Sequence, residues 1–154
     1  MATETERKFL LRTDAWRPEV ISVTAMRQGY LAATPDRSVR VRIAGHLAWL
    51  TLKFGGPGLS REEYEYAIPM TEAEAMLMYT ADTVIKDRHL VPWQGLAFEI
   101  DVFQGPLTGL VLAELELGAG SSPPCLPDWI GREVTGDPRY YNAVLARDGA
   151  PVDV

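Results

Sequence analysis

The sequence contains very little of the chemistry that sulfur and imidazole provide. Among its 154 residues the one cysteine is Cys125, and the two histidines are His46 and His89. A lone cysteine forms neither an internal disulfide nor a multi-thiolate zinc site, so the chain fits a reducing cytoplasm. Cys125 lies in the proline-rich stretch GSSPPCLPD, which is typical of an incidental loop thiol. We expect His46 in a turn and His89 in a structural or exposed position, so no side-chain nucleophile is indicated.

Long apolar segments and an excess of positive charge are also missing. No run approaches the roughly 18 apolar residues that a membrane-spanning helix needs. The N-terminus carries charge from Glu4 onward, unlike a signal peptide. Lysine and arginine number 15 against 21 aspartate and glutamate residues, a net charge of −6. This balance argues against nucleic acid as a partner but allows a local basic pocket. We therefore expect a cytoplasmic protein without a membrane or nucleic-acid partner.

Alternation of apolar and polar residues with a period of two dominates the chain. Short turns separate the alternating segments, which favours antiparallel pairing in a barrel or sandwich. The eight segments expected to form strands are 3–11, 20–31, 37–43, 47–54, 62–68, 83–91, 96–103 and 109–117. We expect one mainly β (α+β) domain over residues 1–148, followed by a flexible tail at 149–154.

Two further segments have a helical pattern, and a third is expected to form one helical turn. These segments span residues 71–81, 138–147 and 127–131. The first begins with Thr71 and has Glu74 three residues later, which predicts a capping box. In the second, Asp137 suits the N-cap and Pro138 suits the first helical position.

Charged residues concentrate on one face of the predicted strands, mostly as pairs of like sign two residues apart. The carboxylates are Glu4, Glu6, Glu63, Glu65, Glu99, Asp101, Glu114 and Glu116, and the cations are Lys8, Arg40, Arg42, Lys53, Lys86 and Arg88. Like charges about 7 Å apart along a strand repel each other, so a merely solvated face explains the pattern poorly. Paired carboxylates suit a hard divalent cation, and paired arginines suit phosphate oxygens. Together they predict a metal–polyphosphate ligand.

Periodicity alone leaves the direction of this charged face open. If the charges point outward, the chain is an ordinary barrel with an apolar core and no evident site. If they point inward, the lumen of an eight-stranded barrel admits one small ligand and must be wet, because unpaired buried ions cost several kcal/mol each. The apolar parity then faces outward and needs cover, which the two helices, with a partner subunit in a homodimer, would supply. The last helix could instead act as a lid or plug.

The charged motifs resemble those of the CYTH proteins, the triphosphate tunnel metalloenzymes. Glu4, Glu6 and Lys8 match the family's ExExK signature. The other matching motifs follow in order as RVRI, TLK, REEYEYAIP, KDR, FEIDVF, AELEL and WIGREVTGDPRYYN. The resemblance covers residues 3–145 and implies a closed eight-stranded antiparallel β-barrel, a tunnel with the charges inside and a few covering helices.

The resemblance also implies a reaction, namely attack of water on a small triphosphate with Mg²⁺ or Mn²⁺. By position, the metal ligands would be Glu4, Glu6, Glu114 and Glu116, and the catalytic set Glu4, Glu6, Lys8 and Glu116. Substrate would be bound by Lys8, Arg40, Arg42, Lys53, Lys86 and Arg88, with Glu63, Glu65, Glu99 and Asp101 as supporting acids.

The substrate expected from the sequence is inorganic tripolyphosphate, because Trp49 is the one aromatic platform that the charged face offers a nucleobase. Alternatives within the family are a thiamine triphosphatase, a nucleoside triphosphatase and a class IV-type adenylate cyclase. An alternative of another class is a non-catalytic module that binds polyphosphate or nucleotide.

Overall fold

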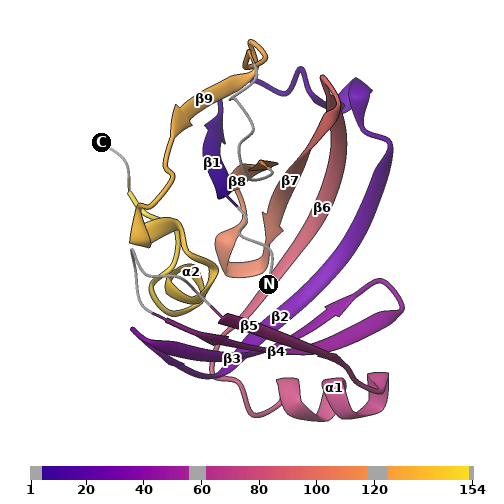
Figure 1. Cartoon of the computed structure of the whole chain (residues 1–154), viewed down its shortest axis with the longest axis vertical. Helices are drawn as coiled ribbons and strands as arrows, with labels where there is room; N and C mark the ends of the chain where they lie inside the picture. Colours follow the sequence, from indigo (N-terminus) through magenta and orange to yellow (C-terminus); the bar gives the residue numbers. More distant parts are fainter. Residues whose placement is uncertain (1–4, 56–61, 118–124, 153–154) are drawn as a thin grey trace.

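The computed structural model describes residues 5–55, 62–117 and 125–152, which form one highly curved sheet with two α-helices (Figure 1). The strands are β1 Thr5–Leu11, β2 Ser22–Thr34, β3 Arg37–Ala44, β4 Leu47–Phe54, β5 Glu62–Ala67, β6 Thr83–Trp93, β7 Leu96–Gln104, β8 Val111–Leu117 and β9 Ile130–Glu133. The helices are α1 Met70–Leu77 and α2 Asn142–Asp148, with short 3₁₀ turns η1 Arg17–Glu19, η2 Gly105–Leu107 and η3 Pro138–Tyr140. All eight predicted strands are thereby confirmed.

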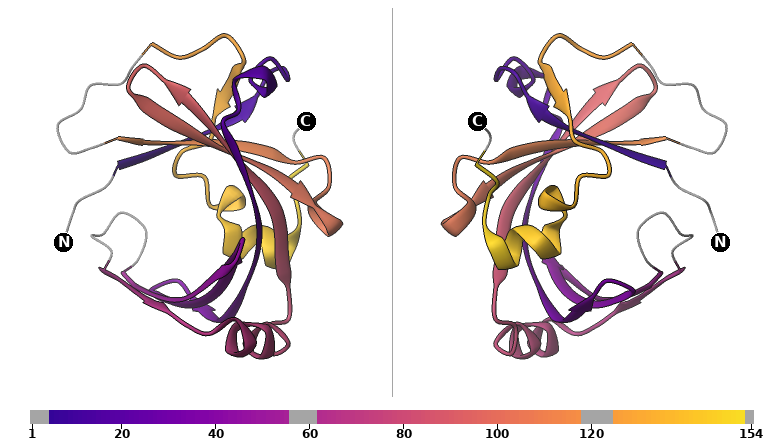
Figure 2. Two further views of the ribbon diagram at one scale, coloured as in Figure 1. Left: turned by 90° about the vertical axis from the view of Figure 1, so that its right-hand side faces the viewer. Right: turned by 90° about the vertical axis from the view of Figure 1, so that its left-hand side faces the viewer.

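The strands pair in the order β5-β4-β3-β2-β6-β7-β8-β1-β9, and every pair is antiparallel. The sheet curls so that β3–β5 face β1 and β8, with α2 between them on the concave side (Figure 2). Residues of these strands and of α2 line the hollow that the sheet encloses. The expected closed eight-stranded barrel is wrong in one respect. Within the described residues the sheet has two free edges, β5 and β9, and no hydrogen-bonded pairing joins them. The ninth strand, β9, was not expected, because its four residues carry no alternating pattern long enough to signal a strand.

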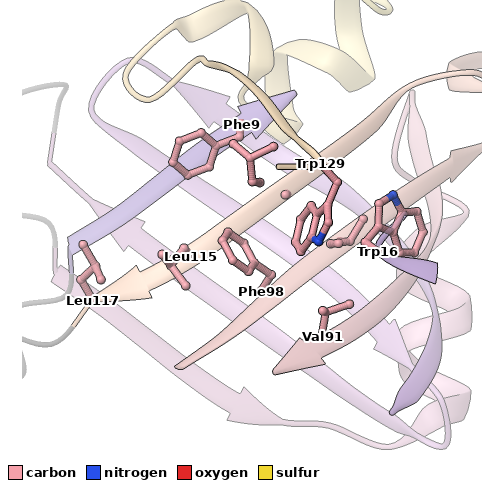
Figure 3. Close-up of a cluster of buried hydrophobic side chains, with 10 residues drawn as sticks. Phe9, Trp16, Val91, Phe98, Leu115, Leu117 and Trp129 are labelled. Atoms are coloured by element: carbon pink, nitrogen blue, oxygen red, sulfur yellow. The ribbon is translucent and has the colours of Figure 1, made fainter. Parts of the chain in front are cut away.

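The apolar parity of the strands faces the convex side, as the inward-charge arrangement requires. Over β6, β7, β8 and β1, it forms a buried cluster that includes Phe9, Phe98 and Leu115 (Figure 3). Trp16, from the β1–β2 connection, and Trp129 pack onto this cluster. His89 lies here as well, with its ring edge-on to Trp16 at 5.2 Å between centroids, so its predicted structural position is confirmed.

The two helices lie on opposite sides of the sheet. Helix α1 covers the convex side of β3 and β4, where Ala73 and Leu77 pack against Val41 and Ile43. Helix α2 lies on the concave side instead, where Leu145 joins Tyr140, Phe103 and other residues in a separate apolar cluster. The expectation that both helices cover the outer face is therefore wrong for α2. That helix fills part of the hollow.

Both helices differ from the sequence-based expectation at their ends. Helix α1 begins at Met70 with Pro69 as its N-cap, and no side chain caps it. The predicted capping box is therefore absent, and Glu74 pairs with Arg27 instead. The segment after Asp137 is interrupted at Tyr141, whose extended backbone separates η3 from α2. The Asp137 side chain accepts a hydrogen bond from the Arg139 amide, as the predicted N-cap should.

The segment at 127–131 forms a turn closed by a hydrogen bond from the Ile130 amide to the Pro127 carbonyl, and it leads into β9 rather than into a helix. Within the described residues, neither helix has the length and apolarity needed to cross a bilayer.

Gly29 fixes how closely the end of α1 approaches β2. A Cβ atom at this position would lie 2.6 Å from Thr80 Oγ1 and 2.8 Å from Thr80 Cβ. In an unobstructed strand, alanine is more stable than glycine by roughly 0.5–1 kcal/mol. We expect Gly29→Ala to destabilise the protein by about 1–3 kcal/mol, because overpacking outweighs that gain. Urea unfolding measures the change, and a more stable variant would contradict this packing.

Candidate active site

The concave face gathers most of the predicted charged residues around one large cavity of about 1000 Å³. Alternation along each strand directs residues i and i+2 to this face. Ten of the fourteen predicted site residues line the cavity: Glu6, Lys8, Arg40, Arg42, Lys53, Glu63, Glu65, Arg88, Glu99 and Glu114. Lys86 and Asp101 are buried beneath it, Glu116 is exposed on β8 beyond Glu114, and Glu4 lies outside the described residues.

One wall of the cavity, on β3 and β4, carries a cluster of positive charge, and the neighbouring strand β5 places Glu63 opposite Lys53. Within the described part of the chain, Arg40, Arg42 and Lys53 form no ion pair with a carboxylate. Burial, together with repulsion from Arg40 and Arg88, lowers the pKa of Arg42 to about 10. Burial and repulsion from Arg40 also lower the pKa of Lys53. An anionic ligand would reduce the repulsion among the cations of this cationic wall.

Neutral groups hold the two arginines of the cationic wall. The Arg42 Nε donates to Gln28 Oε1 at 2.7 Å. A terminal nitrogen of Arg40 donates to Thr51 Oγ1 at 3.4 Å, and Thr51 in turn donates to Glu65 at 3.3 Å. These contacts orient the guanidinium groups but leave their charge available.

The opposite wall, on β1 and β8, crowds carboxylates close together. Burial and the nearby Glu114 carboxylate, which is hydrogen-bonded to Glu6, raise the pKa of Glu6 to about 7, although Lys8 and Lys53 oppose the shift. Lys8 itself pairs with Glu114 at 3.4 Å. A proton shared between two carboxyl groups marks a place where a divalent cation would relieve their repulsion.

The chemistry of this acidic wall fits one hard cation held partly by other ligands. Within residues 5–55, 62–117 and 125–152, no three acidic, histidine or cysteine side chains converge tightly enough to coordinate a metal on their own. Mg²⁺ typically uses only one or two protein carboxylates and completes its shell with water and substrate phosphates. The pair Glu6 and Glu114 satisfies that requirement.

A buried ion network lies between the two walls. Arg88 binds both oxygens of Asp101, at 2.8 and 2.9 Å, and reaches Glu99 at 3.0 Å. Lys86 is fully buried and lies 2.8 Å from Asp101. Burial alone would raise the pKa of Asp101, but Lys86 and Arg88 outweigh it and hold that pKa at about 2. Burial lowers the pKa of Lys86 to about 8, against the attraction of Asp101.

Two lysines of the site contact the C-terminal segment. Lys8 Nζ donates to the Tyr140 carbonyl at 3.0 Å and lies 5.9 Å from the centre of the Tyr141 ring. Lys86 Nζ donates to Asn142 Oδ1 at 3.1 Å. The segment from η3 to α2 is thereby fastened over one end of the hollow, and part of it lines the cavity.

Sequence reasoning missed several uncharged residues of the site. Thr51 shares the parity of Lys53 on β4, so the same alternation could have identified it. Gln28 and Tyr30 gave no such signal, because the charged residue of β2 is Arg27, which has the opposite parity. Asn142 and Tyr141 had no such signal, because they reach the site only through the fold of the C-terminal segment. Trp49 lines a smaller cavity, of about 280 Å³, that also borders Arg40 and Arg42.

Comparisons with known proteins agree with this geometry. The CYTH domain family matches residues 2–141. The inorganic triphosphatase of Acetivibrio thermocellus is 43% identical over 150 residues, covering 96% of both chains. The inorganic triphosphatase of Nitrosomonas europaea is 40% identical over 150 residues, covering 94% of this chain and 97% of that protein.

Solved structures give the same result. The crystal structure of the inorganic triphosphatase NE1496 superposes with a TM-score of 0.72 at 36% identity, covering 98% of this chain and 99% of the other. HpAC1 from Hippeastrum, described as a putative adenylyl cyclase with a dominant triphosphatase activity, shares the fold alone, with a TM-score of 0.58 at 17% identity over 75% of this chain and 80% of its own. The chain therefore belongs to the CYTH domain family.

Proposed function

We propose that this protein is a metal-dependent inorganic triphosphatase that hydrolyses tripolyphosphate by attack of water on a terminal phosphoryl group. The observation that carries the proposal is the pair of opposed walls in one cavity. Cations that form no ion pair within the described residues lie on β3 and β4, and crowded carboxylates lie on β1 and β8. Relatives that are 40–43% identical over nearly their whole length carry the name inorganic triphosphatase, which supports the same substrate.

The cationic wall is suited to grip the substrate. Arg40, Arg42 and Lys53 present donors to phosphate oxygens, and phosphoryl transfer depends mainly on positioning and charge neutralisation. Lys8 and Arg88 also face the cavity, with part of their charge balanced by Glu114 and by Asp101 with Glu99. A linear, highly charged anion without an organic group matches this lining better than a nucleotide does.

The acidic wall is suited to hold the metal. Glu6 and Glu114, with Glu116 further along β8, would bind Mg²⁺ or Mn²⁺, since both are hard cations with oxygen ligands; the predicted ligand Glu4 lies outside the described residues. The bound cation would polarise phosphoryl oxygens and neutralise charge that develops on them. Glu63, Glu65 and Glu99 line the cavity nearby and would orient water or the cations around the substrate.

Lys86 differs from the other cations in this assignment. Its ammonium group is fully buried against Asp101 and Asn142 and does not line the cavity. We therefore assign Lys86 and Asp101 to holding Arg88 in place. The cytoplasmic location, the tail at 149–154 and a homodimer stay predictions.

Turnover tests the proposal directly. We expect phosphate release from tripolyphosphate with Mg²⁺ or Mn²⁺ and none in EDTA, with much slower release from pyrophosphate, ATP and thiamine triphosphate. Cyclic AMP formed from ATP would instead indicate a cyclase. Binding of tripolyphosphate without turnover in either metal would indicate the non-catalytic module.

Replacing one cation tests the role of the cationic wall. We expect Arg40→Met to lower kcat/KM for tripolyphosphate by about a hundredfold, as loss of one preorganised donor does elsewhere. The melting temperature should not fall, because the substitution removes repulsion from Arg42. Arg12→Met, on an exposed arginine outside the cavity, is the matched control and should retain full activity. Equal activity of the two variants would refute the assignment.

The raised pKa of Glu6 predicts how metal affinity depends on pH. A carboxylate must lose its proton to bind a cation, so protonated Glu6 weakens metal binding below about pH 7. Between pH 6 and pH 8 the affinity for Mn²⁺ should rise by about tenfold, measured from the spin-resonance signal of free Mn²⁺.

Substitution of the titrating group provides the control for this pH dependence. Glu6→Gln should bind Mn²⁺ weakly at both pH values, whereas Glu72→Gln, on the exposed first turn of α1, should behave as the wild type. A wild-type affinity that is the same at pH 6 and pH 8 would contradict the assignment of Glu6.

A further inference from the structure

Gln28 is a fully buried amide beside a site composed mostly of charges. On β2 it lies directly opposite Arg42 of β3, and its Oε1 accepts the 2.7 Å hydrogen bond from Arg42 Nε. Its Nε2 has no hydrogen-bond partner among the described residues. Burying an amide with one end unpaired costs free energy, so the position of Gln28 calls for a reason other than stability.

Arg42 is held differently from Arg88. Asp101 binds Arg88 through two oxygens and Glu99 binds it through a third, so much of its charge is balanced. Within the described part of the chain, Arg42 has no carboxylate partner, and its recorded hydrogen bond is the one to Gln28. Arg42 lines both cavities, and the hydrogen bond to Gln28 engages its Nε rather than a terminal nitrogen of the guanidinium.

We propose that Gln28 is a positioning residue for Arg42, a neutral amide that fixes the guanidinium for a phosphate group without cancelling its charge. The inference rests on the proposed function and adds to it the reason why the guanidinium of Arg42 is oriented for a phosphate group. A carboxylate at this position would orient Arg42 equally well but would balance its charge, as Asp101 does for Arg88. A shorter or apolar side chain would leave the charge of Arg42 unbalanced but would no longer orient its guanidinium group.

Packing on both sides keeps Gln28 in register with Arg42. Gly29, the next residue, is held against Thr80 so closely that β2 cannot move toward α1. Across the other neighbouring strand Gln28 lies opposite Val84, which is buried in the cluster that contains Leu145 of α2. The amide is therefore enclosed between the sheet and the concave helix, and its carbonyl is a rigid reference point for Arg42.

The test compares two substitutions at position 28 with a matched glutamine on the outer face. Gln28→Met removes the acceptor, and Gln28→Glu keeps an acceptor but adds a charge. Gln104→Met is the control, because Gln104 is an exposed residue of β7 that hydrogen-bonds Asp87 away from the cavity. We expect both position-28 variants to raise KM for tripolyphosphate by about tenfold, with a smaller change in kcat. In Gln28→Met, Arg42 loses one hydrogen bond, and in Gln28→Glu, the added carboxylate balances the charge of Arg42. Gln104→Met should match the wild type.

A double-mutant cycle separates positioning from a structural role. If Gln28 acts through Arg42, the effect of Gln28→Met on tripolyphosphate binding should disappear when Arg42→Met is already present. Calorimetric titration with tripolyphosphate in EDTA supplies the binding constants for all four proteins without turnover. Additive effects in the cycle, or an unchanged KM in Gln28→Glu, would overturn the inference.

These results also distinguish the inference from the proposed function. A wild-type protein that neither binds nor hydrolyses tripolyphosphate overturns both. If the wild type binds and hydrolyses tripolyphosphate and Gln28→Met has the same activity and affinity, only the role of Gln28 is overturned. Thermal melting of each variant identifies any loss of activity that comes from unfolding.

Discussion

Repulsion among the cations of β3 and β4, which form no ion pair within the part of the chain that the structure describes, is the constraint on which the rest of this structure depends. Arg40, Arg42 and Lys53 lie within one concave surface, and burial makes their mutual repulsion stronger than it would be in water. The convex apolar clusters and α1 supply the free energy that holds the sheet in this shape. The protein is therefore stable enough to keep a site whose charges are balanced only when ligands bind.

The opposite wall, on β1 and β8, has crowded carboxylates instead of crowded cations, and one ligand can balance the charge of both walls. Burial and repulsion from Glu114 raise the pKa of Glu6 to about 7, and Lys53 is close enough to Glu6 to oppose that shift. A metal cation bound to phosphate would reduce the repulsion among the carboxylates and among the basic side chains at the same time. Between them, Arg88 is balanced by Asp101 and Glu99, while Arg42 is oriented by an uncharged amide. The distribution of partners thus indicates which cations are structural and which are left for substrate.

Sequence patterns predicted the strands and the charged face because alternation with a period of two follows directly from strand geometry. They could not decide between an inward and an outward face, since that choice depends on sheet curvature. They missed β9, which pairs in a short irregular segment, and the placement of α2 inside the hollow, which depends on tertiary packing around Leu145. Lys86 was expected to face substrate, but parity alone does not report that Asn142 and Asp101 enclose it.

The most direct test of the account is whether metal and triphosphate stabilise the protein together. The probe is an imido-bridged tripolyphosphate analogue, which resists hydrolysis. Thermal unfolding is measured with the analogue and Mg²⁺, with the analogue in EDTA, and with Mg²⁺ in the absence of the analogue. Because ligands raise stability according to their affinity for the native state, the increase in Tm with both should exceed the sum of the separate increases. Additive increases, or an increase from the analogue that is the same in EDTA, would contradict the claim that the two walls bind one metal–triphosphate ligand.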